Sequence, residues 1–110
     1  GYIEKPLDLN THLIKNELAT FAVKVASLSM LNAGININDI LIVDRSLTAK
    51  SEDIVVALVD NDFTVKRLMV EKNGDHWLKA ENPDFSDIHL KSNQELIIWG
   101  VVTSIIKKLR

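Results

Sequence analysis

The sequence contains no cysteine, which excludes disulfide bonds, thiol catalysis and thiolate metal sites together. It has no apolar stretch near the ~20 residues that a membrane-spanning helix needs, and no segment that resembles a signal peptide. Its four glycines are scattered along the chain, so a glycine-rich phosphate loop is missing as well. We therefore expect a cytoplasmic protein without a membrane segment and without a cofactor.

The sequence also lacks a large excess of positive or negative residues. The chain has 13 Lys and Arg against 15 Asp and Glu, a net charge of −2, which argues against a nucleic-acid-binding surface. The closing Lys107, Lys108 and Arg110 are interpreted as a solvated tail. Apolar residues make up 46% and charged residues 25%, the balance of a globular protein. The length of 110 residues predicts one domain over residues 1–110.

Strand signals dominate what the sequence does contain. Apolar and β-branched runs bounded by turn residues predict a mainly β fold. The predicted strands cover residues 20–26, 40–43, 54–59, 63–70, 75–80 and 95–106. Asp60, Asn61 and Asp62 are expected to join the third and fourth of these strands. The dipeptide Asn73-Gly74 is the strongest hairpin signal in the chain, and Gly100 predicts a bulge or bend in the last strand.

A single short helix is predicted near the N-terminus, over residues 8–15. Asp8 or Asn10 is suited to cap it. Leu9, Leu13 and Ile14 would form its buried stripe.

The histidines do not form a metal site by their spacing. His12, His76 and His89 are far apart, and none has a plausible carboxylate ligand set beside it. We expect all three to be structural or surface residues, and no metal to be bound.

A serine and a lysine are left as candidates for chemistry. Ser29 stands where the apolar run that begins at Phe21 gives way to a turn. A serine hydroxyl needs a base, and neutral lysine is one, although free lysine has a pKa of about 10.4. Burial lowers that pKa, and Lys66 in "FTVKRLMV" lies among apolar neighbours. From the residues alone, a Ser29–Lys66 dyad and an ordinary solvent-facing lysine both remain open.

Several longer stretches carry a family resemblance. They are "FAVKVASLSM", "NDILIVDRSLTAKSEDIVVALVDNDFTVKRL", "LKAENPDF" and "IIWGVVTSIIKKLR". In this order they resemble the LexA/UmuD family of self-cleaving serine–lysine peptidases, with UmuD-type proteins closest, over about Asp8 to Arg110. The resemblance implies a LexA/signal-peptidase-like fold of several coiled antiparallel sheets. It also implies the processed core, without the cleavable N-terminal arm.

The resemblance assigns roles to four groups. Ser29 would be the nucleophile, Lys66 the general base, and the backbone N–H groups of Leu28 and Ser29 the oxyanion hole. One departure concerns the turn, because Ser27-Leu28 stands where the family usually has Gly-Asp. If that position needs a positive φ, serine adopts it only at a cost in free energy.

The resemblance also implies a biological role. It implies a homodimer that cuts its own arm when a RecA-like recombinase filament stimulates it, and that then assists an error-prone Y-family DNA polymerase. The apolar C-terminal strand would contribute to the dimer contact. Two alternatives are the C-terminal domain of a LexA- or phage-type repressor, and a dimerisation module that has lost catalysis.

Overall fold

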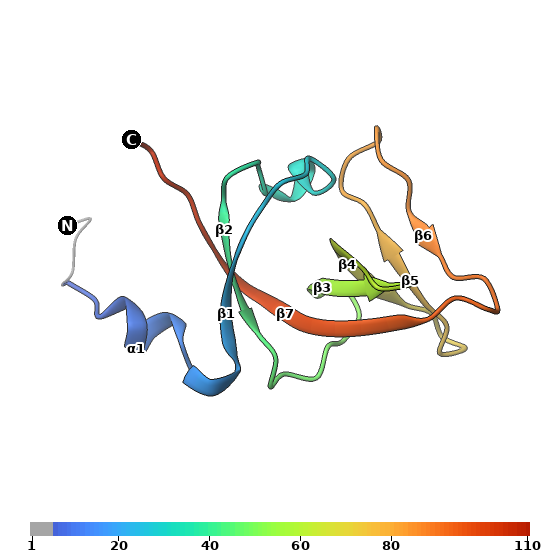
Figure 1. The fold of residues 1–110 in the computed structure, drawn as a ribbon, viewed down its shortest axis with the longest axis horizontal. Helices are drawn as coiled ribbons and strands as arrows, with labels where there is room; N and C mark the ends of the chain where they lie inside the picture. Colours follow the sequence, from blue (N-terminus) through green and yellow to red (C-terminus); the bar gives the residue numbers. More distant parts are fainter. Residues whose placement is uncertain (1–5) are drawn as a thin grey trace.

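The computed structural model describes residues 6–110, and over this range the chain forms one sheet of seven antiparallel strands (Figure 1). The strands are β1 (Thr20–Lys24), β2 (Ile40–Asp44), β3 (Ile54–Val59), β4 (Asp62–Val70), β5 (His76–Lys79), β6 (Ile88–His89) and β7 (Leu96–Ile106). Their order across the sheet is β1-β2-β7-β3-β4-β5-β6. A helix, α1 (Leu9–Leu13), precedes them, and the 3₁₀ turns η1 (Glu17–Ala19) and η2 (Leu31–Ala33) flank β1. The predicted mainly β class is confirmed, with one continuous sheet in place of several.

The predicted turns are formed, with one difference in geometry. Asp60 and Asn61 have φ values of 48° and 70°, so they form a two-residue turn, and Asp62 already pairs with Val59. The turn at Asn73-Gly74 is longer than the two-residue type that the dipeptide favours. Gly74 has a φ of 90°, and the connection from β4 to β5 covers residues 71–75.

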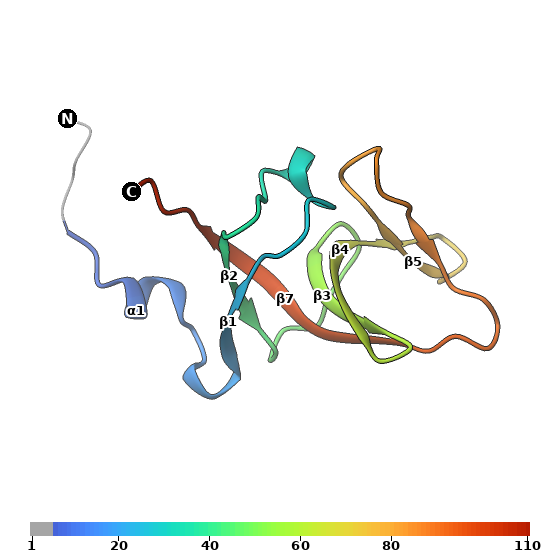
Figure 2. The ribbon, with the colours of Figure 1, turned by 45° about the horizontal axis from the view of Figure 1, so that its top comes forward.

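The helix is shorter than predicted, and the prediction that it has a buried apolar stripe is wrong. The Asp8 carboxylate does cap it, accepting a 3.1 Å hydrogen bond from the Asn10 N–H. However, α1 contains no buried residue, and 60% of Leu9 is exposed. A five-residue helix has too few turns to build an apolar face, and α1 lies to one side of the sheet (Figures 1 and 2).

The sheet is strongly coiled, and β7 explains how. Against β3 the residue Trp99 is unpaired, and against β2 the residue Thr103 is unpaired, so β7 carries two bulges. A bulge bends its strand and increases the local twist. The predicted bend at Gly100 is confirmed, since Gly100 adjoins the first bulge. There β7 passes so close to β2 that a Cβ on Gly100 would lie 2.5 Å from Val43 Cγ1.

This curvature brings distant strands together. Three strands separate β1 from β4, so a flat sheet would hold them about 19 Å apart, at the usual spacing of about 4.8 Å. In the coiled sheet the turn after β1 reaches β4, and it also lies beside the loop after β5 (Figure 2).

Two apolar clusters pack on the sheet, and one of them holds this turn in place. Neighbouring β3 residues point to opposite faces, so that Val56 belongs to the first cluster and Val55 to the second. Met30, only 1% exposed, anchors the turn in the first cluster together with Val25 and Ile35. No helix among the described residues is long and apolar enough to cross a membrane.

Candidate active site

The structure brings the two candidate residues into contact. Ser29 lies in the turn after β1 and Lys66 in the middle of β4, and their side chains are nearly inaccessible to solvent, at 4% and 7% exposure. The Lys66 Nζ donates hydrogen bonds to Ser29 Oγ at 3.1 Å and to Thr64 Oγ1 at 2.6 Å. The expected strand alternation puts Thr64 and Lys66 on one face, which makes the second contact possible.

The surroundings of Lys66 favour its neutral form. Burial lowers the pKa of the Lys66 ammonium below its ordinary value, because the charged form loses its hydration. The ion pairs found in residues 6–110 are Arg67–Glu81 and Lys107–Asp39, and neither involves Lys66. No carboxylate in the described part of the chain therefore offsets the cost of burying its charge.

The Ser29 hydroxyl has two neighbours. Besides Lys66 Nζ, its Oγ lies 3.4 Å from the Val65 carbonyl oxygen, to which it donates. When Lys66 is charged it donates to Ser29 Oγ, and the hydroxyl hydrogen points to Val65. When Lys66 is neutral, its lone pair is free to accept that hydrogen. The geometry thus supports proton transfer from Ser29 to Lys66 without movement of either main chain.

The turn before the nucleophile does not require glycine. In the described residues, positive φ values outside glycine occur at Asn38, Glu52, Asp60 and Asn61, and Ser27 is not among them. The strain considered for serine at this position is therefore not present. Instead, the Ser27 hydroxyl oxygen accepts a 3.1 Å hydrogen bond from the Ser29 N–H.

An apolar cleft of about 610 Å³ opens beside Ser29. Val23, Val25, Val65 and Trp99 contribute to its walls, and Phe63 stands 63% exposed at its margin. Strand β1 forms part of this wall and is one of the two edge strands, so within residues 6–110 one side of its backbone has no partner strand. A free edge beside a nucleophile suits an extended peptide, which pairs with such an edge as an added strand.

Trp99, which forms part of the cleft wall, is contacted by three other side chains. The Trp99 ring lies 5.1 Å from the Phe21 ring and 5.8 Å from the Phe63 ring, between centroids. The Arg45 guanidinium lies 4.5 Å from the Trp99 ring centroid, in cation–π geometry. Arg45 Nε also donates to the Trp99 carbonyl at 2.9 Å, which fixes the bulge at this residue.

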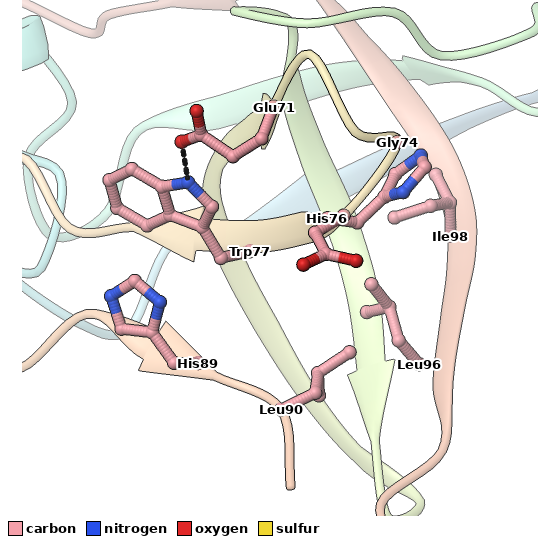
Figure 3. A pocket seen from close by; sticks show the side chains of 9 residues that line it. Glu71, Gly74, His76, Trp77, His89, Leu90, Leu96 and Ile98 are labelled. Carbon is pink, nitrogen blue, oxygen red and sulfur yellow. Dashed lines mark hydrogen bonds between the residues drawn. The ribbon is translucent and has the colours of Figure 1, made fainter. Parts of the chain in front are cut away.

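A second, larger cavity of about 870 Å³ lies at the other end of the sheet (Figure 3). His89 stacks on Trp77 with ring centroids 4.7 Å apart, and the Trp77 indole N–H donates to Glu71 at 2.7 Å. His76 also lines this cavity, whereas His12 lies in α1. In the part of the chain that the structure describes, no three metal-ligating side chains gather. The cavity contains no serine or cysteine nucleophile among its lining residues.

Comparison with known proteins shows to which family the sequence is similar. The Peptidase S24-like family matches residues 1–103. Protein ImpA of Salmonella typhimurium is 36% identical over 109 residues, which cover 99% of this chain and 73% of ImpA. Protein MucA of Escherichia coli is 39% identical over 104 residues, 94% of this chain and 70% of MucA. The LexA repressor of Frankia alni is 36% identical over 96 residues, 87% of this chain and 36% of the repressor.

The chain therefore belongs to the Peptidase S24-like family, a family of serine peptidases, and the predicted membership of the LexA/UmuD family is confirmed. Its similarity to ImpA, MucA and SamA over nearly its whole length makes it a UmuD-like protein, as the sequence predicted.

Other residues around the site were not found from the sequence. Asn82 and Glu81 contact the nucleophile turn, the segment of residues 25–33 that follows β1 and carries Ser29. Thr64 could be placed on the Lys66 face by alternation, but its contact with Nζ depends on the lysine rotamer. No local pattern signals either interaction, because both depend on how the sheet coils.

Proposed function

We propose that this chain is the catalytic core of a UmuD-like self-cleaving peptidase, with Ser29 as nucleophile and Lys66 as general base. The observation that carries the proposal is the 3.1 Å contact between two buried side chains, one of which is a lysine without a carboxylate partner among the described residues. Surface lysines keep their charge, so a lysine buried against a serine hydroxyl is placed for base catalysis.

The mechanism follows from the contacts. Neutral Lys66 Nζ accepts the proton of Ser29 Oγ, which attacks the carbonyl carbon of the scissile peptide bond. The backbone N–H groups of Leu28 and Ser29 stabilise the negative charge on the carbonyl oxygen. The Lys66 ammonium returns its proton to the leaving amine, and an acyl group remains on Ser29. A water molecule, deprotonated in turn by Lys66, then attacks this ester, and Lys66 passes that proton to the departing Ser29 Oγ, which releases the acid and restores the free serine.

The biological setting we propose is SOS mutagenesis, in the cytoplasm. The chain would form a homodimer, cleave its arm when a RecA-like filament on single-stranded DNA stimulates it, and assist a Y-family polymerase in translesion synthesis. The UmuD-like relatives support this reading. The proposed dimer is supported by apolar side chains of β7 that are exposed in the single chain, namely Ile97, Ile105 and Ile106. The LexA similarity keeps a repressor domain as the second candidate.

Cleavage of a supplied substrate tests the proposal. A peptide that spans the cleavage site of a UmuD-like relative is incubated with the protein between pH 7 and 10, and the products are identified by mass spectrometry. We expect cleavage that rises with pH, and a loss of at least about 10³-fold in Ser29→Ala. Ser92→Ala, at an exposed position, should cleave like the parent. A folded parent that cleaves nothing would refute the proposal and favour a non-catalytic module.

The altered turn gives a prediction of its own. The Ser29 N–H donates to Ser27 Oγ, so the substrate oxyanion has to compete with this hydroxyl for the same hydrogen. We expect Ser27→Ala to raise kcat about threefold to tenfold, the value of a hydrogen bond of about 1 kcal/mol. Ser27→Thr keeps the hydroxyl and should keep the parent rate. A slower Ser27→Ala would instead mean that the hydroxyl donates to the oxyanion.

A further inference from the structure

The loop after β5 contacts the nucleophile turn through three hydrogen bonds. The Glu81 N–H donates to the Ser29 carbonyl at 2.9 Å, and the Asn32 N–H donates to the Glu81 carbonyl at 2.8 Å. The third comes from a side chain, since Asn82 Nδ2 donates to the Leu28 carbonyl at 2.9 Å. Both ribbon views place this loop beside the η2 turn (Figures 1 and 2). The turn is therefore held from outside its own sequence.

The Asn82 contact fixes the direction of a catalytic N–H. The Leu28 carbonyl and the Ser29 N–H belong to one peptide group, which is planar and trans, so the two point in opposite directions. Holding the carbonyl toward Asn82 therefore holds the N–H toward the opposite side, where Ser27 Oγ now accepts it. Resting on the proposed function, we infer that Asn82 is a positioning residue that aims the Ser29 N–H at the substrate oxyanion.

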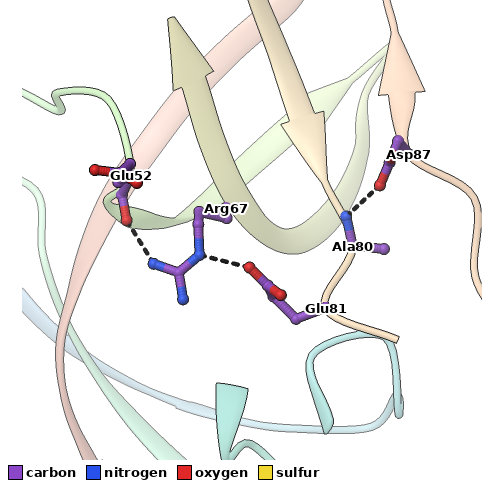
Figure 4. Close-up of polar contacts among 5 residues, drawn as sticks. All are labelled: Glu52, Arg67, Ala80, Glu81 and Asp87. Carbon is purple, nitrogen blue, oxygen red and sulfur yellow. Dashed lines mark hydrogen bonds and ion pairs between the residues drawn. The ribbon is translucent and has the colours of Figure 1, made fainter. Parts of the chain in front are cut away.

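The loop is in turn joined to the strand that carries the base. Arg67, next to Lys66 in β4, donates through Nε to the Glu81 carboxylate at 2.7 Å and through a terminal nitrogen to the Glu52 carbonyl at 2.6 Å (Figure 4). At the start of the loop, the Ala80 N–H donates to the Asp87 carboxylate at 2.8 Å (Figure 4). Nucleophile turn, loop and base strand thus form one hydrogen-bonded unit.

The chemistry of Asn82 allows a selective substitution. Its Nδ2 donates to Leu28, while its Oδ1 accepts a 3.0 Å hydrogen bond from the Asp84 N–H. An aspartate has the same shape and keeps the second contact, but it has no hydrogen to donate to the carbonyl. Asn82→Asp therefore removes the proposed function of the side chain and leaves the loop connection. Asn93→Asp makes the same chemical change at an exposed position and is the matched control.

Steady-state kinetics separate positioning from a general structural effect. With the peptide substrate, we expect kcat of Asn82→Asp to fall about 10- to 100-fold, part of the effect of losing an oxyanion-hole donor, with KM nearly unchanged. The pH midpoint of cleavage should not fall, because the added carboxylate can only favour the ammonium form of Lys66. An unchanged kcat in a parent that cleaves would overturn the inference and leave the proposed function intact. A midpoint below that of the parent would also overturn it, because the added charge does not explain such a shift and Asn82 would then act on Lys66.

Amide hydrogen exchange tests the same inference without activity. In Asn82→Asp the Ser29 amide resonance should shift, and its exchange should speed up at least about tenfold, because the peptide group is no longer held. The Val56 amide in β3 serves as the reference for global stability and should not change, nor should either amide in Asn93→Asp. An unchanged Ser29 amide would overturn the inference even if the parent cleaves no peptide.

Discussion

Lys66→Met is expected to abolish peptide cleavage and at the same time to raise the melting temperature at pH 7. Methionine fills a similar volume without the charge, so the base is lost and the cost of burying an ammonium disappears with it. Activity should fall at least about 10³-fold. Stability should rise by on the order of 1 kcal/mol, or a few degrees, as when buried charges are replaced by apolar side chains.

The stability difference should depend on pH in a defined direction. Burial lowers the pKa of Lys66, so the folded protein binds fewer protons than the unfolded chain between the folded pKa and the ordinary value of about 10.4. The destabilisation by Lys66 is complete below its folded pKa and decreases as pH rises toward 10.4. The advantage of Lys66→Met should therefore be largest at neutral pH and shrink over the range in which the parent gains activity.

Thermal melts across pH, paired with cleavage rates, check this prediction. Lys72→Met removes a charge at an exposed position and should change neither quantity. If Lys66→Met melts below the parent at pH 7, the charged lysine contributes favourable contacts, and its proposed neutral role is wrong.

Gly100→Ala is expected to destabilise the fold by about 1–3 kcal/mol, the usual range for overpacking a core. The added Cβ would lie 2.5 Å from Val43 Cγ1, in a side chain that is completely buried. Because Gly100 adjoins the bulge at Trp99, relief by backbone movement would also change the curvature that brings β1 over β4. We therefore expect the variant to lose cleavage activity at temperatures at which it is still folded.

A double-mutant cycle with Val43→Ala tests the cause. Val43→Ala removes the clashing methyl and by itself leaves a cavity, at a cost of about 1–3 kcal/mol. If the clash is the cause, the double variant should be more stable than the sum of the two losses predicts, with a coupling of about 1 kcal/mol in chemical-denaturation measurements. Strict additivity would show that Gly100→Ala acts through the backbone conformation instead.

The sequence predicts the strands and turns of this protein, but not the contacts between residues that are far apart in the chain. Alternation located the long strands, and Asp60-Asn61 located the turn between β3 and β4, because both signals depend on neighbouring residues. The resemblance pointed to Ser29 and Lys66, which lie 37 positions apart. Their contact depends on two bulges in β7, and the sequence marks only one of them, through Gly100. Asn82 was missed because the coiling of the sheet decides which loop faces the turn.

The alternation of β4 means that the register of this strand decides whether the site can exist at all. Lys66 and Arg67 are consecutive and point to opposite faces, one to Ser29 and the other to Glu81. A slip of one residue against β3 would present the guanidinium to the serine and the ammonium to the carboxylate. A guanidinium keeps its proton at every physiological pH, so the slipped sheet would hold its ion pair and have no base. The two-residue turn at Asp60-Asn61 sets this register, which makes a turn that is not itself part of the cleft lining a determinant of the chemistry.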